Sequence, residues 1–159
     1  MPALQDLPFK IELGRFGRLL MSPAANRHSR LQGRIERLLE DTLGGEAFPE
    51  CAIETPSGVF VPDVVWMSDT FSATLDPYAV ALSAAPEIRV EVMSPSNPWA
   101  EMAEKAPVYL TAGAAEAWVV DVAGGVRFFD AAGERAASAL APSFPNPVPL
   151  PGRPAAPAP

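Results

Sequence analysis

The sequence contains few of the residues that build covalent cross-links or soft metal sites. Its 159 residues include one cysteine, Cys51, and one histidine, His28. A single cysteine excludes an intramolecular disulfide, and one cysteine with one histidine cannot form a structural zinc site of the usual kind. Cys51 has no evident partner base, so we interpret it as structural. A reducing cytoplasm is the simplest setting for such a chain.

Long apolar runs are also missing. No run approaches the ~18 residues of a membrane-spanning helix, and the N-terminal segment lacks the basic start and apolar stretch of a signal peptide. Charged residues make up 19% of the chain against 48% hydrophobic ones, which excludes a highly charged disordered chain. A chain of this length buries roughly 70% of its unfolded surface, so we expect one domain that folds without a disulfide or metal.

Positive charge is scarce. The chain has 12 basic and 19 acidic side chains, giving a net charge of −7 and a pI of about 4.7, which argues against a general nucleic-acid coat protein. Residues 1–41 carry a net +2 and residues 42–159 a net −9. The basic N-terminal region is either a solvated helix face or a modest phosphate-facing patch.

Proline is concentrated at the end of the sequence. Residues 141–159 hold eight of the 19 prolines, and proline fits neither a helix interior nor a central strand. We expect an extended strap over about 141–150 and a Pro-rich disordered tail over 151–159. The globular domain then covers about 7–150.

Two helices are predicted. The first covers about 24–43, because five apolar residues share one helical face and Gly44-Gly45 follows; they are Leu31, Ile35, Leu38, Leu39 and Leu43. The second covers about 98–112 and ends at Gly113. Pro107 lies inside it and should kink or split it, because proline removes a backbone hydrogen bond.

Short strands account for most of the remaining sequence. Runs rich in valine and aromatic residues predict them at 51–53, 58–61, 63–66, 88–93, 117–122 and 126–130, with a further short strand at FKIEL. Gly124-Gly125 predicts a tight hairpin between the last two. The order of helix, strands, helix and strands indicates an α/β (α+β) layer fold around one sheet.

Two carboxylates interrupt apolar strands. Asp63 follows Pro62 and precedes two valines, and Glu91 alternates with Val90 and Val92. A carboxylate in such surroundings is costly unless it is paired or bound to a cation. Asp63 is therefore either a strand-end aspartate or a site residue. Glu91 is either a solvent-facing residue, paired with Arg89, or a site residue.

Two further polar residues, Lys105 and His28, lie on the predicted helices. Lys105 stands four residues after Glu101 on the second predicted helix, a spacing that favours a surface ion pair. The alternative is a functional ammonium group. His28 lies near the start of the first helix, where a packed, hydrogen-bonded histidine is the simpler interpretation.

Several segments in order carry a resemblance to a known family. They are IELGRFGRLLMSPAANRH, VPDVVW, PEIRVEVMSPSN and EMAEKAPVYLTAGAAEAWVVDV, followed by the closing hairpin. Over about residues 9–130 the chain resembles the Uma-type restriction endonucleases, a family of unknown function within the PD-(D/E)XK nuclease superfamily. The resemblance implies a restriction-endonuclease-like αβββαβ core with a mixed central sheet and a divalent-metal site at the sheet edge.

The resemblance also implies roles for particular residues. Asp63 matches the first metal-binding acid and Glu91 the second, with Mg²⁺ or Mn²⁺ as the cofactor. Met93 occupies the usual lysine position, a departure from the superfamily pattern, and Lys105 matches a lysine that this family places on the following helix. Glu12 matches a third family acid, and His28 matches a histidine to which we assign no role.

The resulting functional prediction is a Mg²⁺-dependent endonuclease that hydrolyses phosphodiester bonds in DNA. A hard cation held by two carboxylates can stabilise phosphate charge and activate water. We expect a homodimer, because two scissile strands suit a two-fold assembly. The alternatives are a catalytically inactive nuclease-fold scaffold and a protein-interaction domain that acts through the Pro-rich tail.

Overall fold

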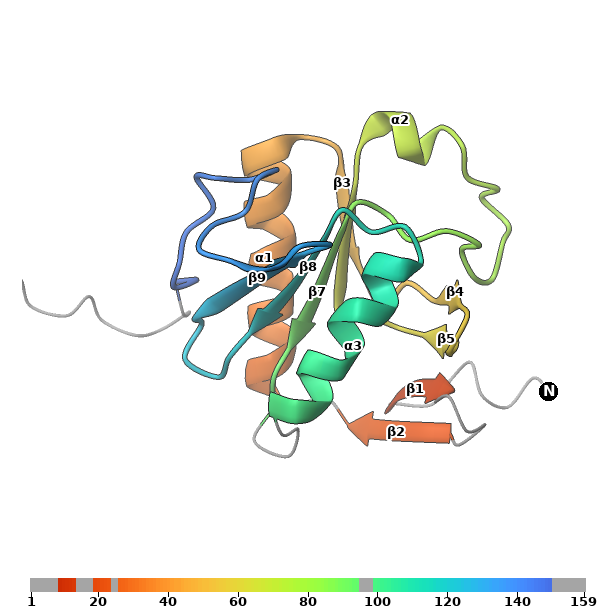
Figure 1. Cartoon of the computed structure of the whole chain (residues 1–159), viewed down its shortest axis with the longest axis horizontal. Helices are drawn as coiled ribbons and strands as arrows, with labels where there is room; N and C mark the ends of the chain where they lie inside the picture. The colour runs from red at the N-terminus through yellow and green to blue at the C-terminus, as the bar shows by residue number, and fades with distance from the viewer. Residues whose placement is uncertain (1–8, 14–18, 24–25, 95–98, 150–159) are drawn as a thin grey trace, which may run out of the picture.

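A six-stranded mixed sheet forms the centre of the molecule (Figure 1). The computed structural model describes residues 9–13, 19–23, 26–94 and 99–149. The strand order is β10-β9-β8-β7-β6-β3, and β7–β8 is the one parallel pair. The strands are β3 Glu46–Pro49, β6 Val64–Met67, β7 Ile88–Val92, β8 Glu116–Val120, β9 Val126–Asp130 and β10 Gly133–Arg135. This arrangement confirms the predicted α/β fold with a mixed central sheet.

Helix α1, Asn26–Leu43, covers one face of the sheet (Figure 1). Its predicted apolar stripe packs against alternate residues of the strands, including Val90 and Trp118, with Leu38 and Leu43 only partly buried. The helix ends where the chain turns through Gly44 and Gly45, both with positive φ. A side chain at Gly45 would also lie 2.5 Å from the Met67 carbonyl oxygen, so glycine is required there. The predicted helix over 24–43 is confirmed from Asn26 onward, and residues 24–25 lie outside the described chain.

Helix α3, Trp99–Thr111, lies on the opposite face (Figure 1). Its buried side chains are Met102, Lys105, Ala106 and Tyr109. Of the predicted kink or split at Pro107, the split is wrong, because one helix continues past Pro107 to Thr111. Gly113, with φ +109°, follows its end as expected.

Three smaller elements complete the described fold. A first hairpin pairs β1, Phe9–Leu13, with β2, Leu19–Pro23, and a second pairs β4, Ile53–Thr55, with β5, Gly58–Phe60. The short helix α2, Asp69–Ser72, begins at Ser68, whose hydroxyl accepts a hydrogen bond from the Phe71 backbone N–H. The strand predicted at 51–53 begins only at Ile53. Four observed elements were not predicted: β2, β3, β10 and α2.

The segment after β10 packs back onto the domain as far as Pro149. Its Phe144 ring meets Trp118 edge to face at 4.8 Å, and the Val148 backbone N–H donates to the Gly124 carbonyl. The predicted strap is therefore part of the core. The predicted tail over 151–159 lies outside the described residues, so it stays a prediction. No helix in the described part of the chain has the length and apolar character needed to cross a membrane.

Candidate active site

Asp63 lies immediately before β6 and is 2% exposed. Its Oδ2 accepts a hydrogen bond of 2.7 Å from the Val92 backbone N–H at the end of the neighbouring strand β7. Its own carbonyl accepts another of 2.7 Å from the Gln32 side chain on α1. The carboxylate is therefore fixed between the start of one central strand and the end of the next.

His28 reaches the same carboxylate from the first turns of α1. Its Nε2 lies 3.1 Å from Asp63 Oδ1, and its side chain is 13% exposed. The interpretation of His28 as a packed histidine is confirmed, and its ion-pair partner is Asp63. The sequence placed His28 on the correct helix but gave no signal for this contact, which joins residues 35 positions apart.

Glu91 is buried, so the interpretation of a solvent-facing strand residue is wrong. All five residues of β7 are buried, because α1 covers the face of Val90 and Val92 while α3 covers the other. Glu91 lies on the α3 face and is 3% exposed. The alternation of the sequence correctly separated the two faces, but it could not show that a second helix covers the polar one.

Two groups on α3 approach the same Glu91 oxygen. The Tyr109 hydroxyl donates a hydrogen bond of 2.7 Å to Oε1, and Lys105 Nζ lies 3.8 Å from it. The Lys105 side chain is only 10% exposed, so a surface position beside Glu101 is excluded. Sequence reasoning missed Tyr109 as a site residue. Its position four residues after Lys105, on the same helical face, was the available signal.

The sheet register brings Asp63 and Glu91 to the same place. Val64 pairs with Val90 and Val65 with Arg89 in the antiparallel β6–β7 pair. The next step of this register sets Asp63 opposite Glu91 on the α3 face, where facing residues of antiparallel strands are neighbours. The two acids, 28 positions apart in sequence, therefore meet at one end of the strand pair.

The remaining predicted residues lie in different places. Met93 directly follows β7, and its backbone N–H donates to the Val120 carbonyl. Glu12 lies on β1, and its side chain is outside what the structure describes. Arg89 does not ion-pair with Glu91 as suggested. Its guanidinium donates to the Pro86 carbonyl instead.

The two carboxylates suit a magnesium ion in donor type and number. Mg²⁺ commonly binds one or two protein carboxylates and completes its shell with water and substrate oxygens. Within the described side chains, no group of three or more His, Cys, Asp and Glu residues converges as a metal-binding cluster. Asp63 and Glu91 thus fit a site with two protein ligands, not a full protein cage.

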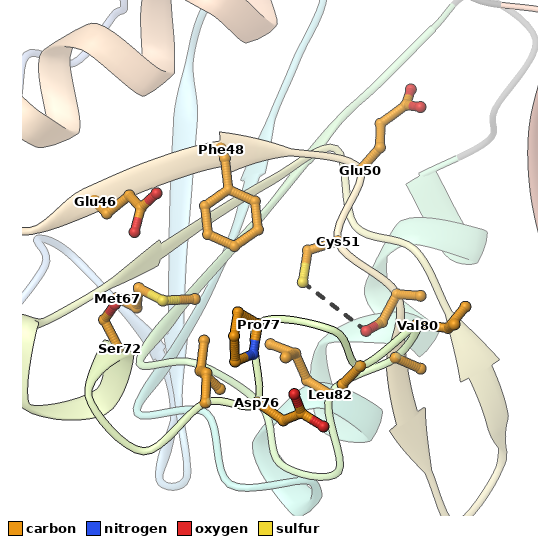
Figure 2. Close-up of a pocket in the computed structure, with 14 residues that line it drawn as sticks. Glu46, Phe48, Glu50, Cys51, Met67, Ser72, Asp76, Pro77, Val80 and Leu82 are labelled. Atoms are coloured by element: carbon orange, nitrogen blue, oxygen red, sulfur yellow. Dashed lines mark hydrogen bonds between the residues drawn. The ribbon is translucent and has the colours of Figure 1, made fainter.

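A separate pocket of about 520 Å³ lies at the β3 edge of the sheet. Figure 2 shows its apolar side chains from β3, β6 and the segment before β7, among them Phe48, Met67 and Leu82. Cys51 is on its wall, where burial raises the pKa of the thiol to about 11. A thiol that stays protonated is a poor nucleophile, which agrees with a structural Cys51. None of the predicted site residues lines this pocket.

Comparison with known proteins agrees with the fold. A solved structure from Anabaena variabilis, described as a putative nuclease belonging to DUF820, matches with a TM-score of 0.62 and 17% sequence identity over 72% of this chain and 68% of that one. At this identity the match supports the fold alone. No curated protein matches the chain.

The family comparison extends over most of the sequence. The model of the Uma2 family, described as "Putative restriction endonuclease", matches residues 1–135. This range includes every residue of the cluster around Asp63 and Glu91 and both helices that hold it. The chain therefore belongs to the Uma2 family of restriction-endonuclease-like proteins.

Proposed function

We propose that the protein is a Mg²⁺-dependent endonuclease that hydrolyses phosphodiester bonds in DNA. The observation that carries the proposal is the meeting of two buried carboxylates with a lysine ammonium group. Asp63, Glu91 and Lys105 come from three different elements, and Lys105 Nζ is 3.8 Å from Glu91. Burying three ionisable groups together is costly for stability, and such clusters are typical of functional sites.

Each residue of the cluster has a task in this reaction. Mg²⁺ or Mn²⁺ held by Asp63 and Glu91 would stabilise charge on the phosphate and lower the pKa of a bound water. Lys105 would donate hydrogen bonds to the attacking water or a phosphoryl oxygen, where its positive charge offsets developing negative charge. Tyr109 and His28 fix the rotamers of Glu91 and Asp63 through their hydrogen-bonding contacts.

Metal binding is the first test. Calorimetric titration with Mn²⁺ should show binding that Asp63→Asn and Glu91→Gln each weaken. Glu87→Gln is the matched control, because Glu87 is a partly buried acid just before β7 that accepts from Ser68 at the other end of the strand. Equal effects of all three substitutions, or no binding by the parent protein, would contradict the proposed site.

Catalysis is the second test. Lys105→Ala should abolish Mg²⁺-dependent cleavage of plasmid DNA while Mn²⁺ binding and the circular dichroism spectrum stay unchanged. Loss of a positioned charge in a site from which water is largely excluded typically costs about 10²- to 10³-fold in rate. Cleavage by this variant at the parental rate would exclude Lys105 from the reaction.

A catalytically inactive scaffold is the second candidate. It is favoured by the protein donors that already surround the two acids: Val92 N–H and His28 at Asp63, and Tyr109 and Lys105 at Glu91. Such a polar cluster can be stable without metal. In that case the parent would neither bind Mn²⁺ nor cleave DNA, and Asp63→Asn would chiefly lower the melting temperature.

We propose a homodimer as the active assembly, because two sites related by a two-fold axis suit the cleavage of both strands of a duplex. Sedimentation equilibrium of the full chain, with and without Mn²⁺, tests this directly. A monomer at all concentrations that also cleaves both strands would contradict it.

A further inference from the structure

A second cluster lies on the α3 face of the sheet, outside the proposed active site. The Arg127 guanidinium carbon lies 3.7 Å from the centre of the Trp99 ring and 5.8 Å from that of Phe129. The two rings are 6.3 Å apart and inclined by 31°. Trp99 begins α3, whereas Arg127 and Phe129 are on β9, so the cluster joins the helix start to the sheet.

The guanidinium group is exposed yet held in one orientation. Arg127 Nε and Nη2 donate to the two carboxylate oxygens of Glu134 on β10, at 2.6 and 2.7 Å. Both side chains are 45% exposed. A bidentate pair of this kind fixes the plane of the guanidinium as well as its position. Trp99 and Glu134 together therefore present a rigid planar cation at the surface.

The charge balance of this cluster argues against a phosphate clamp. Glu134 neutralises Arg127 and uses two of its N–H groups, so little net charge remains for a phosphate. What remains is a layered arrangement of ring and guanidinium planes. Nucleobases stack on aromatic rings and arginine planes in single-stranded nucleic-acid sites.

The cluster is close to the proposed active site. Arg127 pairs with Val119, and Val119 pairs with Glu91, so the three residues form one row across β9, β8 and β7. Adjacent strands are about 4.8 Å apart, which puts the Arg127 and Glu91 backbones about 10 Å apart. Trp99 and Lys105 also share α3, six residues apart.

We propose that Trp99, Arg127 and Phe129 form a platform that stacks an unpaired base of the strand being cut. This inference rests on the proposed nuclease function and narrows its substrate class. Bases inside a duplex are already stacked on both sides, so the platform favours a single strand or a locally unpaired segment. The alternative is that the cluster only pins the start of α3 onto the sheet.

The test measures binding without cleavage. The full chain is titrated in EDTA with a 12-residue oligothymidylate and with a 12-base-pair duplex, and tryptophan emission is recorded. Trp66 and Trp118 are only 7% and 1% exposed, so a change on binding reports chiefly on Trp99. The oligothymidylate should quench the emission and the duplex should not.

Two arginine variants separate stacking from charge. Arg127→Gln should weaken binding of the oligothymidylate about 5- to 150-fold, the range expected for one stacked base. Arg135→Gln is the control, because Arg135 is also exposed and paired, with Asp130 at 2.7 Å. It should change the affinity less than twofold. The salt dependence of binding should be the same in Arg127→Gln as in the parent, since its charge is already neutralised.

Other results would overturn the platform. Equal weakening of oligothymidylate binding by both substitutions would show a simple charge effect. If the oligothymidylate leaves the tryptophan emission of the parent unchanged and Arg127→Gln binds it as tightly as the parent, the cluster serves only to hold the start of α3 on the sheet. Both outcomes are independent of the nuclease proposal, because loss of cleavage in Lys105→Ala is measured with metal and on another substrate.

Discussion

Arg89 is the least well-paired charged residue of the described core. It is 1% exposed, it points to the face covered by α3, and its guanidinium donates to the Pro86 carbonyl. Its Nε and Nη1 have no hydrogen-bond partner in the part of the chain that the structure describes. The Tyr109 ring, 5.9 Å away, is a weak substitute. Burial lowers the pKa of Arg89 to about 9.

Replacing this guanidinium should stabilise the protein. Arg89→Met keeps an unbranched apolar stem, shorter than arginine by two atoms, and removes a buried charge that few groups solvate. Comparable replacements of buried ionic groups raise stability by about 1–4 kcal/mol. The midpoint of urea unfolding at pH 7.5 should therefore rise. A lower midpoint would show that the interactions with Pro86 and Tyr109 outweigh the cost of burying the charge.

The gain in stability of Arg89→Met should also depend on pH. The folded-state pKa of Arg89 lies below its ordinary value, so the folded protein binds this proton less tightly than the unfolded chain. The free-energy cost of burying the charged guanidinium is complete below pH 9. It decreases as the pH rises above 9, because Arg89 loses its proton in the folded protein first. The advantage of Arg89→Met should accordingly be constant from pH 6 to 8 and shrink above pH 9. An advantage that grows above pH 9 would contradict this linkage.

At the scale of elements, Glu116 connects the sheet to the C-terminal segment. It is 4% exposed on β8, and its carboxylate accepts hydrogen bonds from Trp118 Nε1, the Ser138 hydroxyl and the backbone N–H groups of Ala139 and Leu140. A buried carboxylate with four donors is well compensated. It fixes the segment that brings Phe144 and Val148 into the core.

Removing this carboxylate should loosen the C-terminal segment. Glu116→Ala leaves four donors without their acceptor, so we expect a loss of about 3–5 kcal/mol in the free energy of unfolding. Hydrogen exchange should increase first at Ala139 and Leu140. Glu134→Ala, at an exposed position, is the control and should leave the free energy of unfolding nearly unchanged. Similar losses in the two variants would contradict the role of Glu116.

The sequence predicted elements with a clear apolar period and missed those without one. The stripe of α1 and the valine-rich strands β6 to β9 were predictable, because burial imposes periods of 3.6 and 2. Strand β10 is exposed throughout and β3 ends in a proline, so neither carries such a pattern. The burial of Glu91 and Lys105 depends on α3 folding over the sheet, a tertiary contact that no local pattern contains.

At the scale of the whole molecule, two hydrophobic cores hold the site between them. One lies between α1 and the sheet and includes Val90 and Trp118. The other lies on the α3 face and includes Val65 and Tyr109, whose hydroxyl meets Glu91. The carboxylates are thus anchored on a rigid frame.

The Pro-rich end of the chain should not contribute to the stability of the domain. Residues 152–159 contain few backbone donors and little apolar surface suited to a packed core. Their deletion should leave the melting temperature unchanged within error, measured by differential scanning calorimetry. A drop of several degrees would show that this segment docks on the domain and would favour the protein-interaction alternative.

The order of the elements along the chain has a consequence for biosynthesis. His28, Asp63, Glu91 and Lys105 come from α1, the start of β6, β7 and α3, so they span most of the described chain. A ribosome delivers them in that order, and α3 must emerge and pack before the cluster exists. Every incomplete product that stops before Lys105 lacks an ammonium group beside Glu91. On the proposed function, chains that stop before Lys105 cannot cleave the nucleic acids around them.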